Sequence, residues 1–207
     1  EKAEKCAMLL HTEEVSEHGT DLLAIIELLF EDYPNNVFFT RGKFAPKHMN
    51  YLYNMADVQI LLSSNEGWGL SLTEALLTGT PIIANTTGGM QDQMRFEDEN
   101  GNWIDFDADF PSNHKGTYKT SGEWAFPVFP TNRSIQGSPR TPYIWDDRCN
   151  AEDAADQLMN VYSLGKDKQK ELGNKGREWA LGSEAGFSSQ YQAERIVEAF
   201  NQLFNTW

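Results

Sequence analysis

Short apolar runs alternate with amphipathic helical patterns through residue 84, and this alternation constrains the fold more than any other feature of the sequence. The strand-like runs are Cys6–Leu10, Val37–Phe39, Val58–Leu62 and Pro81–Ala84. The helical patterns between them cover Asp21–Glu31 after a capping Thr20, then Pro46–Met55 and Ser71–Thr78. Such alternation is typical of right-handed βαβ units in a parallel sheet. We therefore predict an α/β fold, a Rossmann-like parallel sheet flanked by helices, whose ligands bind outside the carboxyl ends of the strands.

The alternation stops after the fourth strand-like run. Residues Phe96–Cys149 show no regular period, so we expect an irregular insertion with short strands rather than one long loop. Three helical patterns follow, at Ala151–Leu164, Asp167–Leu181 and Ser188–Phe204. We predict a Rossmann-like domain over residues 1–165, with the insertion at about 96–149, and a helical tail over 166–207. Because Glu1 stands directly before a strand-like run, we expect the sequence to be a piece of a longer protein.

The charge balance excludes one class of partner. Acidic residues number 31 against 17 basic ones, a formal net charge of −14, so we expect no general electrostatic binding of nucleic acid. No apolar run reaches the ~20 residues of a transmembrane helix, and we expect no transmembrane segment. Cys6 and Cys149 cannot form a disulfide framework. A reducing, cytoplasmic compartment fits these features, with peripheral attachment to a membrane left open.

The most informative motif is the stretch Ser64–Ala75, which lies between a strand-like run and a helical pattern. Gly67 and Gly69 lack a Cβ, so a ligand can approach their backbone closely. The N–H groups at the start of the following helix favour anionic oxygens, and Ser71 adds a hydroxyl there. The motif therefore predicts a phosphate cradle, although a purely structural glycine-rich junction is equally favoured by this spacing alone.

Two carboxylates flank the motif. Glu66 precedes the helix, and Glu74 lies one turn inside it, where helical side chains lean back toward the N-terminus. A carboxylate can accept hydrogen bonds from two neighbouring hydroxyls. A cradle for phosphate with two carboxylates beside it suits a ligand that joins phosphate to a polyhydroxylated sugar.

Several spaced motifs together resemble the second domain of group-1 glycosyltransferases, the retaining enzymes of glycosyltransferase family 4 with a GT-B fold. The matching segments are Leu52–Val58, Ser63–Leu70, Glu74-Ala75, Gly79–Ile83 and Gly88-Gly89. The two glutamates separated by seven residues in that family match Glu66 and Glu74. The resemblance covers Thr20–Asp92 and resumes loosely at Asn150–Ala180. The insertion between these parts is not a usual feature of the family.

The resemblance implies a role for each matching residue. Glu66 would be the catalytic residue, in contact with the transferred sugar, and Glu74 would bind the ribose hydroxyls. The backbone of Gly67, Trp68 and Gly69 would bind sugar hydroxyls, and Leu70 and Ser71 would bind phosphate. The base would lie against Gly42, Lys43 and Phe44. Gly88 and Gly89, which precede Asp92, would also contact the donor.

One departure from the family concerns the leaving diphosphate. The family usually places an Arg and a Lys-Gly pair in the first loop, where Glu13 and His18 stand in this sequence. Such cations offset charge that builds on the leaving group. Because Glu13 repels a diphosphate, we expect a cation from elsewhere to compensate. The candidates are Arg133 and Arg140 of the insertion and Arg41 and Lys43, each of which is equally well explained as a solvated surface residue.

The resemblance implies a donor-binding domain that serves in the retaining transfer of a sugar from a nucleoside-diphosphate sugar to an acceptor hydroxyl. The acceptor, whether glycan, lipid or protein, is expected to bind an N-terminal domain of the same protein. We expect no resident cofactor and no metal, and Asp105–Asp109 is expected to be a solvated acidic loop. Two alternatives remain, a non-catalytic module that binds nucleotide sugar or glycan and a nucleotide-sugar epimerase with the GT-B fold.

Overall fold

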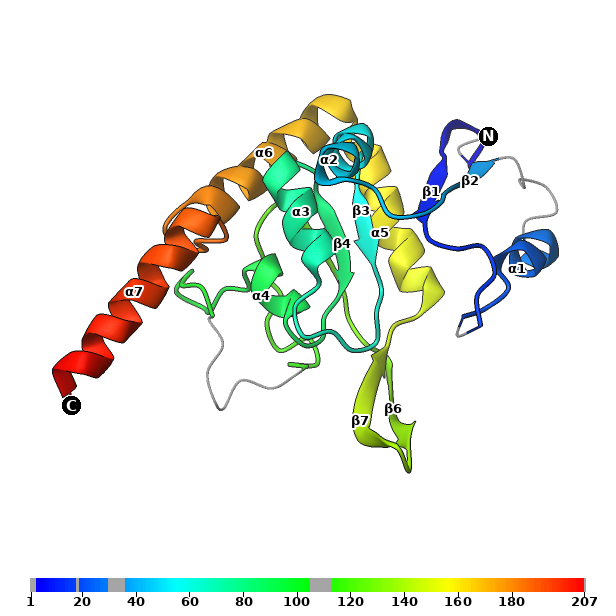
Figure 1. Ribbon diagram of the computed structural model, residues 1–207. Helices are drawn as coiled ribbons and strands as arrows, with labels where there is room; N and C mark the ends of the chain where they lie inside the picture. Colours follow the sequence, from blue (N-terminus) through cyan, green and yellow to red (C-terminus); the bar gives the residue numbers. More distant parts are fainter. Residues whose placement is uncertain (1–2, 18, 30–35, 105–112, 207) are drawn as a thin grey trace. The chain divides into compact units, whose positions relative to one another are not determined.

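The computed structural model describes residues 3–17, 19–29, 36–104 and 113–206 (Figure 1). Contacts divide the chain into two compact units, residues 1–49 and 50–207. The division falls within helix α2, Pro46–Met55, whose bounds agree with the predicted helix. The predicted domain boundary at residue 165 stays a prediction.

The first unit contains a short parallel sheet and one helix. A 3₁₀ turn at Ala3–Lys5 precedes β1, Met8–His11, which pairs with β2, Val37–Thr40. Helix α1 covers Leu22–Leu29. It is capped by Asp21, whose Oδ1 accepts the N–H of Ala24 at 3.0 Å, so the predicted cap at Thr20 is wrong by one residue. Glu31, the predicted helix end, lies outside the described residues.

The second unit is built on a three-stranded parallel sheet in the order β3-β4-β5. Its strands are Gln59–Leu61, Ile82–Asn85 and Ala125–Val128. Every residue of β4 is buried, as expected for a central strand covered on both faces. The α/β prediction with parallel strands flanked by helices is confirmed; among the described residues the parallel strands form two sheets, β1-β2 and β3-β4-β5, and β5 comes from the predicted irregular insertion.

Helices cover the second sheet and continue to the end of the chain (Figure 1). They are α3 (Leu70–Thr78), α4 (Met90–Met94), α5 (Ala151–Leu164), α6 (Lys166–Leu181) and α7 (Ser189–Thr206). Ala154 and Val161 of α5 join Ile83 and Val128 of the sheet in the core. Helix α6 lies against α3, where a Cβ on Gly173 would overlap the carbonyl oxygen of Gly79. No helix of the described residues is long and apolar enough to cross a membrane.

The insertion contains a hairpin that projects from the sheet of the second unit (Figure 1). Strands β6, Asn132–Ser138, and β7, Thr141–Arg148, pair antiparallel, with Arg133 opposite Asp147 and Ile135 opposite Trp145. The sequence predicted short strands in this region without placing them.

Candidate functional site

The loop between β3 and α3 holds the glycine-rich motif at the carboxyl end of the sheet. Gly69 precedes α3 with φ +84°, a conformation that favours glycine, and a Cβ there would lie 3.2 Å from both Leu61 Cδ2 and Met90 Cγ. Its carbonyl accepts the N–H of Leu72 at 2.9 Å, which closes the first helical turn. The first N–H groups of a helix have no partner within the helix, so this end of α3 can bind an anion.

Gly88 and Gly89 lie directly against the backbone of this motif. A Cβ on Gly88, where φ is +52°, would overlap the carbonyl oxygen of Glu66, and one on Gly89 would overlap that of Gly67. The N–H of Gly89 donates to the Glu66 carbonyl at 3.1 Å. These glycines therefore let the loop after β4 support the loop after β3, and their predicted contact with the donor stays a prediction. Gly67 itself has open space where its Cβ would be.

A buried glutamine that the sequence did not predict holds the backbone of the motif by hydrogen bonds. The Gln93 side chain of α4 is fully buried and donates to the carbonyls of Trp68 and Gly69, the latter at 3.2 Å. It also accepts from the Thr73 hydroxyl at 2.7 Å, and Trp68 Nε1 donates to that hydroxyl at 2.8 Å. Its one sequence signal was an amide on the side of a short helix that also carries Met90 and Met94. The Trp68 indole meets Phe187 edge to face at 5.1 Å, so its side chain serves packing.

Glu74 is exposed on α3 and is held by Tyr53 of α2. The Tyr53 hydroxyl donates to Glu74 Oε2 at 2.7 Å, and the Tyr53 side chain is itself buried. Burial first, and then the hydrogen bond and the negative charge of Glu74, raise the pKa of Tyr53 well above its usual value. Tyr53 therefore stays a donor at any physiological pH and restricts the Glu74 carboxylate to one position, with one oxygen left toward solvent.

The β6–β7 hairpin is attached to the loops that follow β3 and β4, which the sequence did not predict. The N–H of Asp147 donates to the Ser64 carbonyl at 2.8 Å, and Asn65 Nδ2 donates to the Trp145 carbonyl at 3.1 Å. The buried Asp147 carboxylate accepts from the Thr87 hydroxyl at 2.9 Å, and Asn85 Nδ2 donates to the Asp147 carbonyl at 2.7 Å. The hairpin is thus attached at the same edge of the sheet as the glycine-rich motif.

The candidate cations lie in different surroundings. Arg133 Nε is 3.1 Å from Asp147 Oδ1, so this arginine belongs to the attached end of the hairpin. Arg140 is exposed in the hairpin turn. In the first unit, Arg41 forms a two-pronged ion pair with Glu14 at 2.6 and 2.7 Å, and the hydrogen bond and charge of Glu14 raise the pKa of Arg41.

The remaining predicted residues do not belong to the described part of the unit that contains this motif. Gly42, Lys43 and Phe44 belong to the first unit, where Phe44 lies 4.9 Å from His11 between ring centroids. His18 and the acidic stretch Asp105–Asp109 lie outside the described residues. Among the residues that are described, no cluster of His, Cys, Asp or Glu could hold a metal ion.

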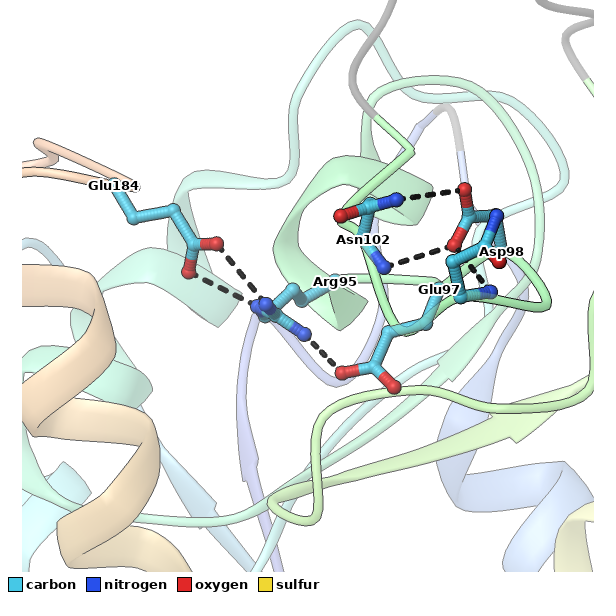
Figure 2. A network of polar contacts seen from close by, with 6 residues as sticks. Arg95, Glu97, Asp98, Asn102 and Glu184 are labelled. Atoms are coloured by element: carbon cyan, nitrogen blue, oxygen red, sulfur yellow. Dashed lines mark hydrogen bonds and ion pairs between the residues drawn. The ribbon is translucent and has the colours of Figure 1, made fainter.

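A polar network surrounds Arg95, the residue that follows the C-terminal end of α4. Figure 2 shows Arg95 between two carboxylates, with Glu184 at 3.0 Å through two hydrogen bonds and Glu97 on the other side. The hydrogen bond with Arg95 is the main reason that the pKa of Glu184 is lowered. Asp98 in the same picture accepts the N–H of Asn102 at 2.8 Å. The network fixes the end of the helix that carries the buried glutamine beneath the motif.

Residues 26–110 match the family model described as glycosyl transferases group 1. This segment, less than half of the chain, is similar to the group 1 glycosyltransferases. It contains the β3–α3 junction, both glutamates and the Gly88-Gly89 pair described above. The likeness found in the sequence motifs is therefore confirmed for this segment, while assignment to family 4 and to the C-terminal half of an enzyme is taken up below as a proposal.

Two curated relatives are also glycosyltransferases. The chain is 27% identical over 117 residues to an uncharacterized glycosyltransferase of Methanocaldococcus jannaschii, a match that covers 55% of the chain and 27% of the relative. It is 44% identical over 46 residues to a D-inositol 3-phosphate glycosyltransferase of Corynebacterium urealyticum, which covers 22% of the chain and 11% of that protein.

Solved structures show the same fold. A sucrose-phosphate synthase of Thermosynechococcus elongatus superposes with a TM-score of 0.61 at 20% identity, covering 96% of the chain and 38% of that structure. A glycosyltransferase of Rickettsia africae gives 0.60 at 16% identity, with 96% and 40% covered. These likenesses establish the GT-B type of α/β fold. The chain spans two fifths or less of each protein named here.

Proposed function

We propose that this chain is the donor-binding, C-terminal domain of a retaining hexosyltransferase of glycosyltransferase family 4. The observation that carries the proposal is the β3–α3 junction, where open space at Gly67 and the first amides of α3 lie at the carboxyl end of a parallel sheet. A nucleoside-diphosphate sugar matches this junction because it presents both phosphate oxygens and sugar hydroxyls.

In this proposal a different set of protein groups binds each part of the donor. The amides at Leu70 and Ser71 hold the diphosphate, and the backbone of residues 67–69 holds the transferred sugar. Glu66 acts next to the anomeric carbon as the catalytic residue. Glu74, oriented by Tyr53, accepts hydrogen bonds from the ribose hydroxyls through its solvent-facing oxygen.

The diphosphate needs positive charge that position 13 does not supply. Of the candidate cations, we retain Arg133, because its partner Asp147 is bonded to the loops after β3 and β4. We further propose that Gly42, Lys43 and Phe44 lie against the base of the donor, that His18 lies on the diphosphate side, and that a separate N-terminal domain binds the acceptor. A cytoplasmic location and the absence of a resident cofactor belong to the same proposal.

A second candidate is a non-catalytic module that binds nucleotide sugar or glycan. Glu13 favours this reading, because an acidic side chain in place of the family's arginine weakens stabilisation of the leaving diphosphate. Both candidates predict donor binding. They differ in turnover, which is measured as consumption of donor by the longer protein with and without acceptors.

The test is a thermal-shift and titration screen of UDP-, GDP- and ADP-sugars against the chain and its Glu74→Ala variant. Loss of a charge-assisted hydrogen bond from ribose weakens binding about tenfold or more, and it does so for every donor, because all of them share the ribose. Glu178→Ala, which removes an exposed carboxylate from α6, is the matched control and leaves binding unchanged. An effect of Glu74→Ala on one sugar alone would show that the assignment to ribose is wrong.

A further inference from the structure

The two faces of the β6–β7 hairpin differ in character. Side chains alternate between the faces of a strand, and the register places Ile135 opposite Trp145 and Arg133 opposite Asp147. One face therefore carries Arg133, Ile135, Tyr143 and Trp145, which we name the aromatic face. Tyr143 is 68% exposed and Trp145 50%, far more than aromatic residues that serve a core.

The aromatic face has a fixed geometry. Gly137 lies beside Tyr143, and a Cβ on this glycine would lie 3.0 Å from Tyr143 Cδ1. The glycine thus leaves room for the tyrosine ring to lie across the backbone of the neighbouring strand, with the opposite side of the ring in solvent. Arg133 lies over the Trp145 ring at 5.3 Å from its centroid and is held by its ion pair with Asp147. Both rings are therefore oriented before any ligand binds.

The aromatic face is continuous with the candidate donor site. Asp147 stands at its base and accepts from Thr87, in the loop that leads to Gly88 and Gly89. The Trp145 carbonyl accepts from Asn65, which directly precedes Glu66. A molecule lying on the rings of the aromatic face would thus extend from the side of the motif where the transferred sugar is expected.

We propose that the aromatic face binds a saccharide acceptor, whose apolar C–H faces stack on Tyr143 and Trp145. This inference rests on the proposed function and names the acceptor class. The negative face of an aromatic ring attracts polarised C–H groups, and the Tyr143 hydroxyl adds a polar group at the rim. The acceptor would then receive contacts from the donor-binding domain itself as well as from the N-terminal domain.

A membrane surface fits the hairpin less well. A hairpin that enters a bilayer interface presents apolar side chains at its tip, whereas this tip is Ser138-Pro139-Arg140-Thr141. The rings lie along one face of the strands rather than in the turn itself.

The test measures binding of four neutral tetrasaccharides, from maltose, cellulose, chitin and mannan series, by saturation-transfer NMR and titration. We expect the chain to bind at least one of them with a millimolar Kd, and Tyr143→Ala and Trp145→Ala each to weaken that binding about tenfold. Ile144→Ala is the matched control, because Ile144 is an exposed apolar residue on the opposite face of β7. Circular dichroism checks that all three variants, each altered at an exposed position, keep the fold.

Three results would overturn the inference: no tetrasaccharide binds the chain, the two aromatic variants bind as well as the unaltered chain, or the aromatic face binds phosphatidylcholine–phosphatidylglycerol vesicles instead. Titration with nucleotide sugars separates this failure from that of the proposed function. Tyr143→Ala, which keeps the Trp145 ring that Arg133 lies over, leaves donor binding unchanged, so donor binding without saccharide binding refutes only the aromatic face.

Discussion

Gly67 and Gly88 are indistinguishable as glycines in the sequence, yet the structure gives them opposite surroundings. Nothing lies within 4 Å of the position where a Cβ on Gly67 would be, whereas one on Gly88 would overlap the carbonyl oxygen of Glu66. Gly88 also has φ +52°, which disfavours any side chain. The first glycine keeps space free for a ligand, and the second lets two loops approach each other.

This difference predicts different outcomes for two alanine variants. Gly88→Ala destabilises the chain by about 2–4 kcal/mol, through steric overlap and backbone strain, and it displaces Glu66. Gly67→Ala changes the free energy of unfolding by less than about 0.5 kcal/mol but weakens donor binding about tenfold, because the methyl group fills the space of the ligand. Urea denaturation and donor titration measure the two quantities. If Gly67→Ala binds donor normally, the ligand does not approach this backbone.

The sequence could predict the motif but not what holds it. The spacing of Glu66, the glycines and Glu74 is local along the chain, so their order relative to a strand and a helix follows from the pattern. The supports of the motif are distant in sequence: Tyr53 holds Glu74, Gln93 holds the loop, and Asp147 joins the insertion to it. Such contacts depend on the tertiary fold and leave no periodic signal.

Among the secondary-structure elements, the first four strands and the helices with a clear period were predicted closely, whereas the short elements after β4 were not placed. The bounds of α2 and α5 agree with the prediction at both ends. Strand β5 was not placed within the predicted insertion because it contains Pro127, which edge strands tolerate. Helix α4 was not predicted, because five residues are too few to show helical periodicity.

One buried carboxylate contributes to the attachment of the hairpin, beside the backbone hydrogen bonds to Ser64, Asn65 and Asn85. Asp147 is 1% exposed, accepts from Thr87 and pairs with Arg133. Asp147→Ala removes the acceptor from both partners. We expect this loss to lower the free energy of unfolding by about 1–3 kcal/mol. We expect faster amide hydrogen exchange throughout residues 132–148 while β3 and β4 remain protected. Asp146→Ala, on the opposite face of β7, is the control, and equal exchange in the two variants would contradict the role of Asp147 as the attachment.

Over the molecule as a whole, the excess of acidic residues disfavours the binding of an anionic ligand. The formal net charge of −14 creates a negative potential, which a nucleoside diphosphate must cross before it reaches the first amides of α3. Those amides are dipoles that act only at short range, and Arg133 is paired with Asp147. The long-range term is therefore repulsive, and the attractive terms are local.

This balance fixes the sign of the salt dependence of donor binding. Raising the ionic strength from about 0.01 M to about 0.15 M shortens the screening length from ~30 Å to ~8 Å, which removes much of the long-range repulsion but leaves contacts within the site largely intact. We expect the Kd for a nucleotide sugar to fall by about twofold to threefold over this range. The corresponding uncharged nucleoside serves as the control, because its binding has no charge to screen. A Kd that rises with salt would instead show that cationic side chains, rather than the first amides of α3, supply most of the attraction for the diphosphate.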